Sequence, residues 1–350
     1  MKTMKTMKTM KTMKTGTLVT ALRSAALAGC ALALVASTSP LGAAQRGGLP
    51  SQKAISKELK ELHDDDQKDQ NDPSWDASND TAFSGRQKQR RDRVMEIVEA
   101  GMLASIQDWG HAALLLQHGQ TTDDILLAHV LSIPPGIADE PFARFLCAAT
   151  LDRFLQGIGR AQIFTTQSGA PDPETYMPLE PFDDSMSQSV RELFTLPPLP
   201  REKEPSMEKD KKSAGASAKE LPKLLEQSQE EPGQGTGTPA WLLQIREIVL
   251  GATLKSDKDF DMAARILLAS KEPEDLLSAH VLAMCAAQKS KKGDAPRVLC
   301  AHTLDRFLLS IGKPQRFDTV QENGTPLEPR RPVQEFIRVM YGTSAGRKAQ

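Results

Sequence analysis

The sequence predicts an all-α protein in which two similar helical-bundle lobes are joined by a disordered linker. Aromatic residues make up only 5% of the 350-residue chain, a composition that favours helices over β-sandwiches. Apolar residues also recur at helical spacing in several segments. Finally, a long stretch of sequence occurs twice, which predicts two copies of one helical domain.

The internal duplication is clearest at the sequence LDRFL. Three pairs of segments match: 146–155 with 299–308, 127–131 with 278–282, and 178–181 with 326–329. The offset of about 150 residues exceeds the 20–50 residues of solenoid units, so the pattern indicates a duplicated domain and not a repeat array. Residues shared by both copies indicate scaffold, whereas residues found in one copy indicate a special task.

Residues 1–44 are predicted to be a signal peptide. Five Met-Lys-Thr units give a basic start, and Ala25–Val35 gives an apolar segment too short to cross a membrane comfortably. Gly42–Ala44 supplies small residues for cleavage. A lipoprotein signal is the rival interpretation, because Leu27–Cys30 fits a lipobox, but the apolar run continues past Cys30. A periplasmic or secreted bacterial protein is therefore expected, with a lipid anchor through Cys30 as the less favoured alternative.

The balance of charge argues against nucleic-acid binding. Lys and Arg number 44 and Asp and Glu number 45, so no positive field attracts phosphate backbones. No transmembrane span is expected after signal cleavage. We expect an envelope protein or a small-molecule ligand as partner, and neither a cofactor nor a metal.

Residues 45–86 are predicted to form a disordered polar segment. The acidic run at His63–Asp66 is compatible with calcium binding, but the loop glycine and the terminal glutamate of an EF-hand are missing. A solvated tail is therefore the prediction for this segment.

Residues 87–199 form the first predicted lobe, here called lobe 1, with four helices. Apolar spacing, capping-box patterns and glycine stops place these helices at Arg93–Leu103, from Ser105 to Gly119, from Thr121 onward, and from Pro141 to Ile158. The fourth helix is apolar almost all round, which is typical of a buried, central helix.

A linker over 200–238 is rich in Lys, Glu, Ser, Pro and Gly and lacks apolar periodicity. The second lobe, lobe 2, spans 239–341 and is followed by a tail at 342–350. Its helix starts at Ser256–Asp259 and Pro273 match those of lobe 1. Because the linker is long, the lobes are expected to be able to act independently.

Signal cleavage leaves three cysteines, Cys147, Cys285 and Cys300, and an odd number cannot form a complete disulfide framework. Cys147 and Cys300 hold the same place in the two copies, so we expect small buried hydrophobes there. A bridge between Cys285 and Cys300 is a weaker alternative.

The candidate site belongs to lobe 1 and contains polar residues at three places. Its residues are Gln117, His118, Asp152, Arg153, Gln162, Thr166 and Gln167. Asp152 and Arg153 interrupt an apolar helix, and unpaired buried charges are costly. We therefore expect Asp152 to accept hydrogen bonds from amides of the 162–167 loop, and Arg153 to reach a carbonyl or a carboxylate.

The second copy separates scaffold from special residues. It keeps Asp305, Arg306, Gln315 and Thr319, with Gln321 displaced by one position, which favours a structural role for these positions in both lobes. It also keeps His280 opposite His129, where a satisfied helix histidine is expected. The Gln117–His118 pair is replaced by Leu268 and Ala269. That pair is the sharpest functional candidate, and capping of the helix end is an equally good alternative.

Recognisable catalytic motifs are missing. The chain has no glycine-rich phosphate loop, no His-Glu-x-x-His, no Cys-x-x-Cys and no Gly-x-Ser-x-Gly elbow. A metal held by His118, His129 and Asp152 is conceivable in principle, but their spacing is not diagnostic. Whether the protein is an enzyme is therefore open.

The order Gln117–His118, Asp152–Arg153, Gln162 and Thr166–Gln167, followed by Pro-Leu-Glu-Pro and Arg191, resembles an uncharacterised bacterial family, the DUF6624 domains of unknown function. The resemblance extends from Arg93 to Leu199. Family members carry a glycine where this chain has Thr165. The resemblance implies a helical domain in exported or lipid-anchored proteins, with no known activity, and lobe 2 then looks like a degenerate copy.

Two functional hypotheses follow. In the first, lobe 1 is a non-enzymatic binding or interaction module and lobe 2 is its structural partner. In the second, the protein is a hydrolase in which His118 is the general base and Arg153 holds an anionic group. The second hypothesis requires His118, Asp152 and Gln167 to converge within hydrogen-bond reach in an open cleft.

Overall fold

The computed structural model describes residues 50–72, 81–168, 178–183, 186–196, 217–230, 238–290 and 295–344. Within these ranges the protein is essentially all-α, as predicted, and its one sheet has two short strands. None of the described helices is long and apolar enough to span a bilayer. The signal segment 1–44 and the end of the predicted tail lie outside the described residues.

The centre of lobe 1 contains three helices at the predicted places: α4 (Ile106–Leu116), α5 (Thr122–Ile137) and α6 (Pro141–Gly157). Ser105 and Thr121 begin α4 and α5 through the capping boxes that the sequence predicted. A proline begins α6, where its missing N–H leaves no gap in the helix. A short helix, α7 (Gln188–Leu193), follows the loop after α6.

Lobe 2 has the same order of elements: α10 (Asp257–Leu267), α11 (Pro273–Lys289), α12 (Ala295–Ser310) and α13 (Glu335–Met340). Ser256 caps α10 and Pro273 begins α11, both as predicted. The strands β1 (Gln321–Glu322) and β2 (Thr325–Pro326) pair antiparallel between α12 and α13. The repeated sequence segments therefore occupy matching places in the two lobes.

The prediction of disorder over 45–86 is wrong for the part that the structure describes. Gln52–Gln70 forms helix α2, and α3 (Thr81–Glu99) begins earlier than the sequence indicated. Two side chains of α2, Ile55 and Leu59, are completely buried. The segment is mostly charged and has few apolar residues, so its composition predicts disorder even though those apolar residues have helical spacing.

The predicted linker also contains structure. Within 200–238, a short 3₁₀ turn over Ala218–Glu220 leads into α8 (Leu221–Glu230), which buries Leu221 and Leu224 against α9 (Ala240–Leu250) and α10. Residues 200–216 and 231–237 lie outside the described residues. Each lobe is thus preceded by a helical arm, α2 with α3 in one case and α8 with α9 in the other.

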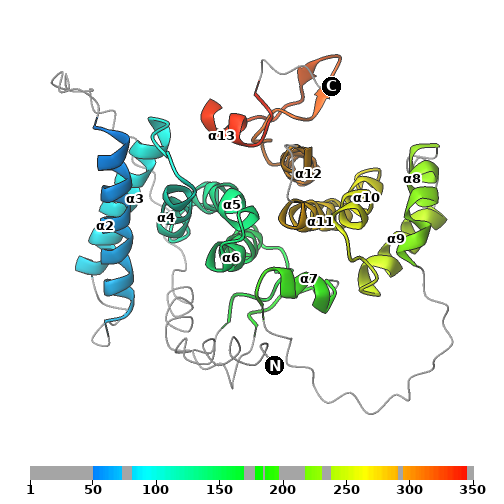
Figure 1. Cartoon of the computed structure of the whole chain (residues 1–350), viewed down its shortest axis with the longest axis horizontal. Coiled ribbons are helices and arrows are strands. Elements are labelled where there is room, and N and C mark those ends of the chain that lie inside the picture. Colours follow the sequence, from blue (N-terminus) through cyan, green and yellow to red (C-terminus); the bar gives the residue numbers. More distant parts are fainter. Residues whose placement is uncertain are drawn as a thin grey trace, which may run out of the picture.

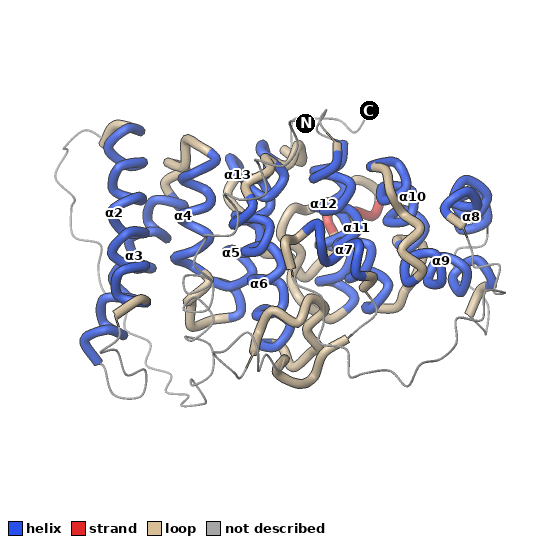
Figure 2. Tube along the Cα trace, turned by 60° about the horizontal axis from the view of Figure 1, so that its bottom comes forward, coloured by secondary structure: helices blue, strands red, loops and turns tan. Residues whose placement is uncertain are grey.

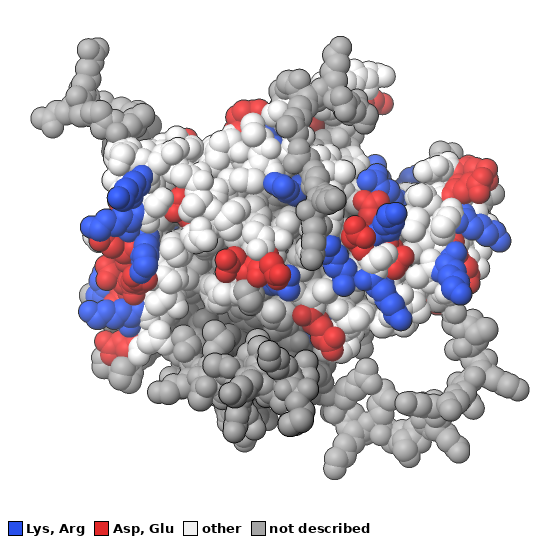
Figure 3. Space-filling view, in the orientation of Figure 1, with Lys and Arg blue, Asp and Glu red and all other residues white. Residues whose placement is uncertain are grey.

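The helices lie in a row, with α2 and α3 at one end and α8 at the other (Figure 1, Figure 2). The lobes meet in the middle through α5 and α11, and their apolar residues form one continuous cluster. Basic and acidic side chains are interspersed along the outer arms, with no extended patch of one sign on the face shown (Figure 3). This distribution accords with the near-zero net charge of the chain.

The last helix of each lobe packs against the other lobe. In α13, the ring of Phe336 meets Trp109 of α4 at 5.6 Å, and the next residue after the helix, Tyr341, donates its hydroxyl to the Val130 carbonyl of α5 at 2.7 Å. On the opposite side, α7 of lobe 1 contacts α11. The expected independence of the lobes is therefore not what the structure shows, because each completes the surface of the other.

The three cysteines are free and buried, so the alternative bridge between Cys285 and Cys300 is not formed. Cys147 and Cys300 lie in the apolar cluster, as predicted for small hydrophobes. Burial raises the pKa of the Cys147 thiol to about 12, so these groups stay protonated and inert at neutral pH.

Candidate functional site

Asp152 organises the loop that follows α6. Its carboxylate accepts hydrogen bonds from the backbone N–H groups of Ile163 (2.8 Å), Phe164 (2.9 Å) and Thr166 (2.7 Å), and from the Thr166 hydroxyl (2.7 Å). Burial raises the pKa of Asp152, and these four donors oppose that shift. The expectation that Asp152 binds loop amides is confirmed, and the carboxylate has little capacity left for a ligand.

Lobe 2 repeats this arrangement with Asp305. Its carboxylate accepts from the N–H of Arg316 (2.6 Å), from the N–H of Thr319 (3.0 Å) and from the Thr319 hydroxyl (2.7 Å). Because both lobes contain this contact, it does not indicate a function specific to lobe 1, and the aspartate has a structural role in each lobe.

Gln162 closes the same loop. Its Nε2 donates to the carbonyls of Gln167 (3.1 Å) and Leu179 (2.5 Å), and its Oε1 accepts from the Gln167 N–H (3.0 Å). In lobe 2, Gln315 makes the same pattern with Val320. The structural counterpart of Gln167 is therefore Val320, and the sequence pairing of Gln167 with Gln321 is wrong.

Arg153 points from α6 to the end of α4. Its Nη1 donates to the Gln117 carbonyl at 2.7 Å, and its Nε to the Gln167 Oε1 at 3.3 Å. Both acceptors are uncharged, so burial lowers the pKa of Arg153 to about 10. Within the described residues, Nη2 has no acceptor and the guanidinium pairs with no carboxylate. The predicted carbonyl contact is confirmed.

Gln117 and His118 end α4 with side chains that are not used for capping. Only 6% of Gln117 is exposed, and among the described residues its carboxamide has no hydrogen-bond partner. The partly buried His118 imidazole has none there either. Burial lowers the pKa of His118 to about 4, against the opposing charge of Asp66, so the ring is neutral at pH 7.

Asp66 of α2 is a site residue that the sequence did not reveal. It is fully buried, accepts from Gln87 Nε2 at 2.6 Å, and lies 3.8 Å from Arg90 Nη1. Its signal was its register: it follows the buried Leu59 by seven residues, two helical turns along the same face. We call Asp66, Gln117, His118, Arg153 and Gln167 the His118 site.

His129 belongs to a different part of the molecule. Its Nε2 lies 3.1 Å from Nε2 of His280, and its Nδ1 lies 3.1 Å from the Cys147 carbonyl, at the contact between α5 and α11. It is completely buried, as expected of a satisfied helix histidine. No group of three His, Cys, Asp or Glu residues among the described residues is placed to hold a metal, so His118, His129 and Asp152 do not form one.

The convergence that the hydrolase hypothesis requires is not formed. Both carboxylate oxygens of Asp152 accept hydrogen bonds from the 163–166 loop, and the carboxylate that acts on His118 is that of Asp66. Gln167 donates its Nε2 to the Ala149 carbonyl at 3.2 Å and is fixed by the loop. The structure brings Gln117, His118, Arg153 and Gln167 together and leaves Asp152, Gln162 and Thr166 behind them as support.

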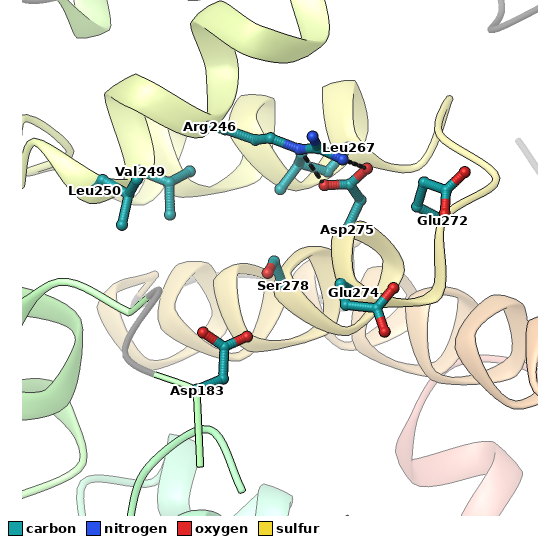
Figure 4. Close-up of a pocket in the computed structure, with 9 residues that line it drawn as sticks. All are labelled: Asp183, Arg246, Val249, Leu250, Leu267, Glu272, Glu274, Asp275 and Ser278. Atoms are coloured by element: carbon teal, nitrogen blue, oxygen red, sulfur yellow. Dashed lines mark hydrogen bonds and ion pairs between the residues drawn. The ribbon is translucent and has the colours of Figure 1, made fainter. Parts of the chain in front are cut away.

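Two surface hollows lie away from these residues. One, of about 340 Å³, lies beside the paired Arg246 and Asp275, with Asp183 of lobe 1 on its far side (Figure 4). The other, of about 250 Å³, lies between α10 and the ends of α11 and α12. Neither is lined by a residue of the predicted site, whose His118 and Arg153 are themselves partly exposed.

The chain matches no protein-family model. Searches of curated proteins and of solved structures give no match either.

Proposed function

We propose that the protein is an exported binding module. Lobe 1 holds a small ligand with an anionic group at the His118 site, and lobe 2 is the structural partner that completes the fold. One observation carries this proposal. Three polar positions of lobe 1, Gln117, His118 and Gln167, correspond to the apolar Leu268, Ala269 and Val320 in lobe 2, around an arginine that both lobes retain.

The chemistry of the free groups supports an anionic ligand. The Nη2 of Arg153, the carboxamide of Gln117 and the neutral imidazole of His118 can all donate hydrogen bonds, and charge-assisted bonds from a guanidinium to a carboxylate are among the strongest in proteins. Asp66 opposes an anion, but Arg90 and Gln87 already engage its carboxylate. Arg306 of lobe 2 also has no carboxylate partner in the part of the chain that the structure describes, so the arginine alone would not identify a site.

The predicted signal peptide and the resemblance to a family of exported domains support a place in the cell envelope. We infer a periplasmic or secreted protein, with anchoring through Cys30 as the less favoured form. The ligand would then be a metabolite or a cell-wall fragment that carries a carboxylate.

A thermal-shift screen of the mature chain tests the proposal, with metabolites and cell-wall fragments grouped by charge. Carboxylate compounds should raise the unfolding temperature of the native protein and should fail to do so in Q117L/H118A, which carries the residues of lobe 2. The matched control L268Q/A269H changes the corresponding place in lobe 2 and should keep the response. Equal stabilisation of Q117L/H118A, or no stabilisation by any compound, would overturn the proposal.

A further inference from the structure

Helix α2 lies over the His118 site and meets α4 through two polar contacts. Ser56 Oγ donates to Asp108 Oδ2 at 2.9 Å, and the rings of His63 and His111 lie 4.5 Å apart, centre to centre. One turn further along α2, Asp66 acts on His118. Ile55 and Leu59 are the two residues of α2 inside the apolar core, and Leu62 packs against its edge. A helix held by so few apolar groups opens more readily than the central helices do.

The His63–His111 contact is the part of the interface between α2 and α4 that responds to acid. The Nδ1 of His111 is buried without a hydrogen-bond partner in the described part of the chain, so a proton added there would face no acceptor. His63 lies at the rim, where its Nδ1 is 3.2 Å from Asp64 Oδ1.

The charges around His111 come from both helices. Lys60, His63 and Asp64 act from α2, and Asp108 acts from α4. Burial is the largest influence and lowers the pKa of His111; the neighbouring His63 adds to this, while Asp108 and Asp64 oppose it. The neutral ring is therefore the form that suits the packed helix.

We propose that α2 is a cover over the His118 site that acidification releases by protonating His111. The purpose of such a cover rests on the proposed ligand site, because α2 places Asp66 against His118, and its departure would remove that carboxylate and widen access for an anionic ligand. Arg93 bonds Glu58 and Arg90 bonds Asp69, and these ion pairs keep α2 beside α3 when it leaves α4. A helix that has lost its packing on α4 and keeps only ion pairs frays, and its amides exchange faster.

Hydrogen exchange of the mature chain, followed by mass spectrometry at about pH 7.5 and about pH 5, tests the cover across the range in which histidine titrates. After correction for the intrinsic rate, protection over 52–70 should fall severalfold at the lower pH, because protonated His111 disfavours the packed helix. Protection of α6 and α12 should change only with the global stability, and equally in the variant H63F/H111F. In H63F/H111F, which keeps two stacked rings that cannot titrate, α2 should stay protected at both pH values.

H302A is the matched control, because it removes a partly buried histidine of lobe 2 and installs the alanine found at the same place in lobe 1. Its α2 should respond to acid like that of the native protein. If H63F/H111F folds poorly, H111F alone tests the same point. Equal protection of α2 at both pH values, or a response that persists without the histidines, overturns the cover. A ligand screen without hits would count against the proposed function and leave this result unaffected.

Discussion

At the scale of single residues, the His118 site contains polar groups that lower the stability of the fold, next to scaffold residues that raise it. Gln117 holds a shielded carboxamide without a partner among the described residues, whereas Asp152 receives four hydrogen bonds from its loop. Unsatisfied buried polar groups destabilise a fold, and functional sites often retain them because ligand binding needs them. The two kinds of residue should therefore respond oppositely to apolar substitution.

We expect Gln117→Leu, the residue of lobe 2, to raise the free energy of unfolding by about 1 kcal/mol, because it removes an unpaired amide from a shielded place. Asp152→Ala should lower it by about 3 kcal/mol, because four buried donors lose their acceptor. Urea denaturation of both variants at neutral pH measures these differences. A marked loss of stability in Gln117→Leu would show that the carboxamide is structural after all.

Much of the scaffold was predictable from individual residues. A charged pair inside an apolar helix must find partners, which correctly pointed Asp152 to the loop amides and Arg153 to a carbonyl. Asp66 was not predictable in this way, because an aspartate in a charged segment is ordinary and only the fold shows that it is buried. The pairing of Gln167 with Gln321 failed for a related reason: sequence identity outweighed the hydrogen bonds that place Val320 there.

At the scale of elements, the contact between α5 and α11 is centred on two buried histidines. His129 and His280 face each other at 3.1 Å, and each ring also lies 3.1 Å from a backbone carbonyl, that of Cys147 or Cys300. Burial lowers the pKa of both rings, that of His129 to about 4. The neutral form therefore stabilises the pair in full above pH 6.5, the ordinary value, and this contribution is lost as the pH falls from 6.5 towards 4.

We expect H129L/H280L to flatten the pH dependence of stability. The native protein should lose about 3 kcal/mol through His129 alone over that interval, since one pKa unit corresponds to about 1.4 kcal/mol. The double variant should lose less, because leucine does not titrate. Urea unfolding at about pH 7.5 and about pH 4.5 compares the two. Each single variant should be less stable than the double variant, since it leaves one imidazole facing leucine; the same acid sensitivity in H129L/H280L would contradict the assignment.

The helices α2 and α8 show where prediction of elements from sequence reaches its limit. The central helices were predicted with correct starts because capping patterns and apolar spacing agree there. The two outer helices each carry two apolar side chains that are completely buried or nearly so, in segments rich in charge. Such helices gain most of their stability from packing on a neighbour, and composition does not report that neighbour.

At the scale of the whole molecule, the connection between the lobes matters less than the surface they share. The sequence suggested two bodies on a long linker, because the segment 200–238 has no apolar periodicity. What composition could not show is that α13 covers α4 and α5 of lobe 1, or that α5 meets α11. These contacts join segments that are far apart in the sequence, and an apolar helix face does not say which helix it packs against.

Cutting the chain between the lobes tests this shared surface. A protease site placed within 200–216 should yield two fragments that stay together, because the contacts of His129 with His280, Phe336 with Trp109 and Tyr341 with Val130 remain. Size-exclusion chromatography of the cleaved protein should show one species that contains both fragments. In F336A/Y341A, which loses the buried Tyr341 ring and the partly buried Phe336 ring against lobe 1, the fragments should separate at concentrations where the native fragments stay together, because truncating a buried ring costs about 3–5 kcal/mol. Separate peaks for the cleaved native protein would mean that the lobes are independent, as the linker alone suggested.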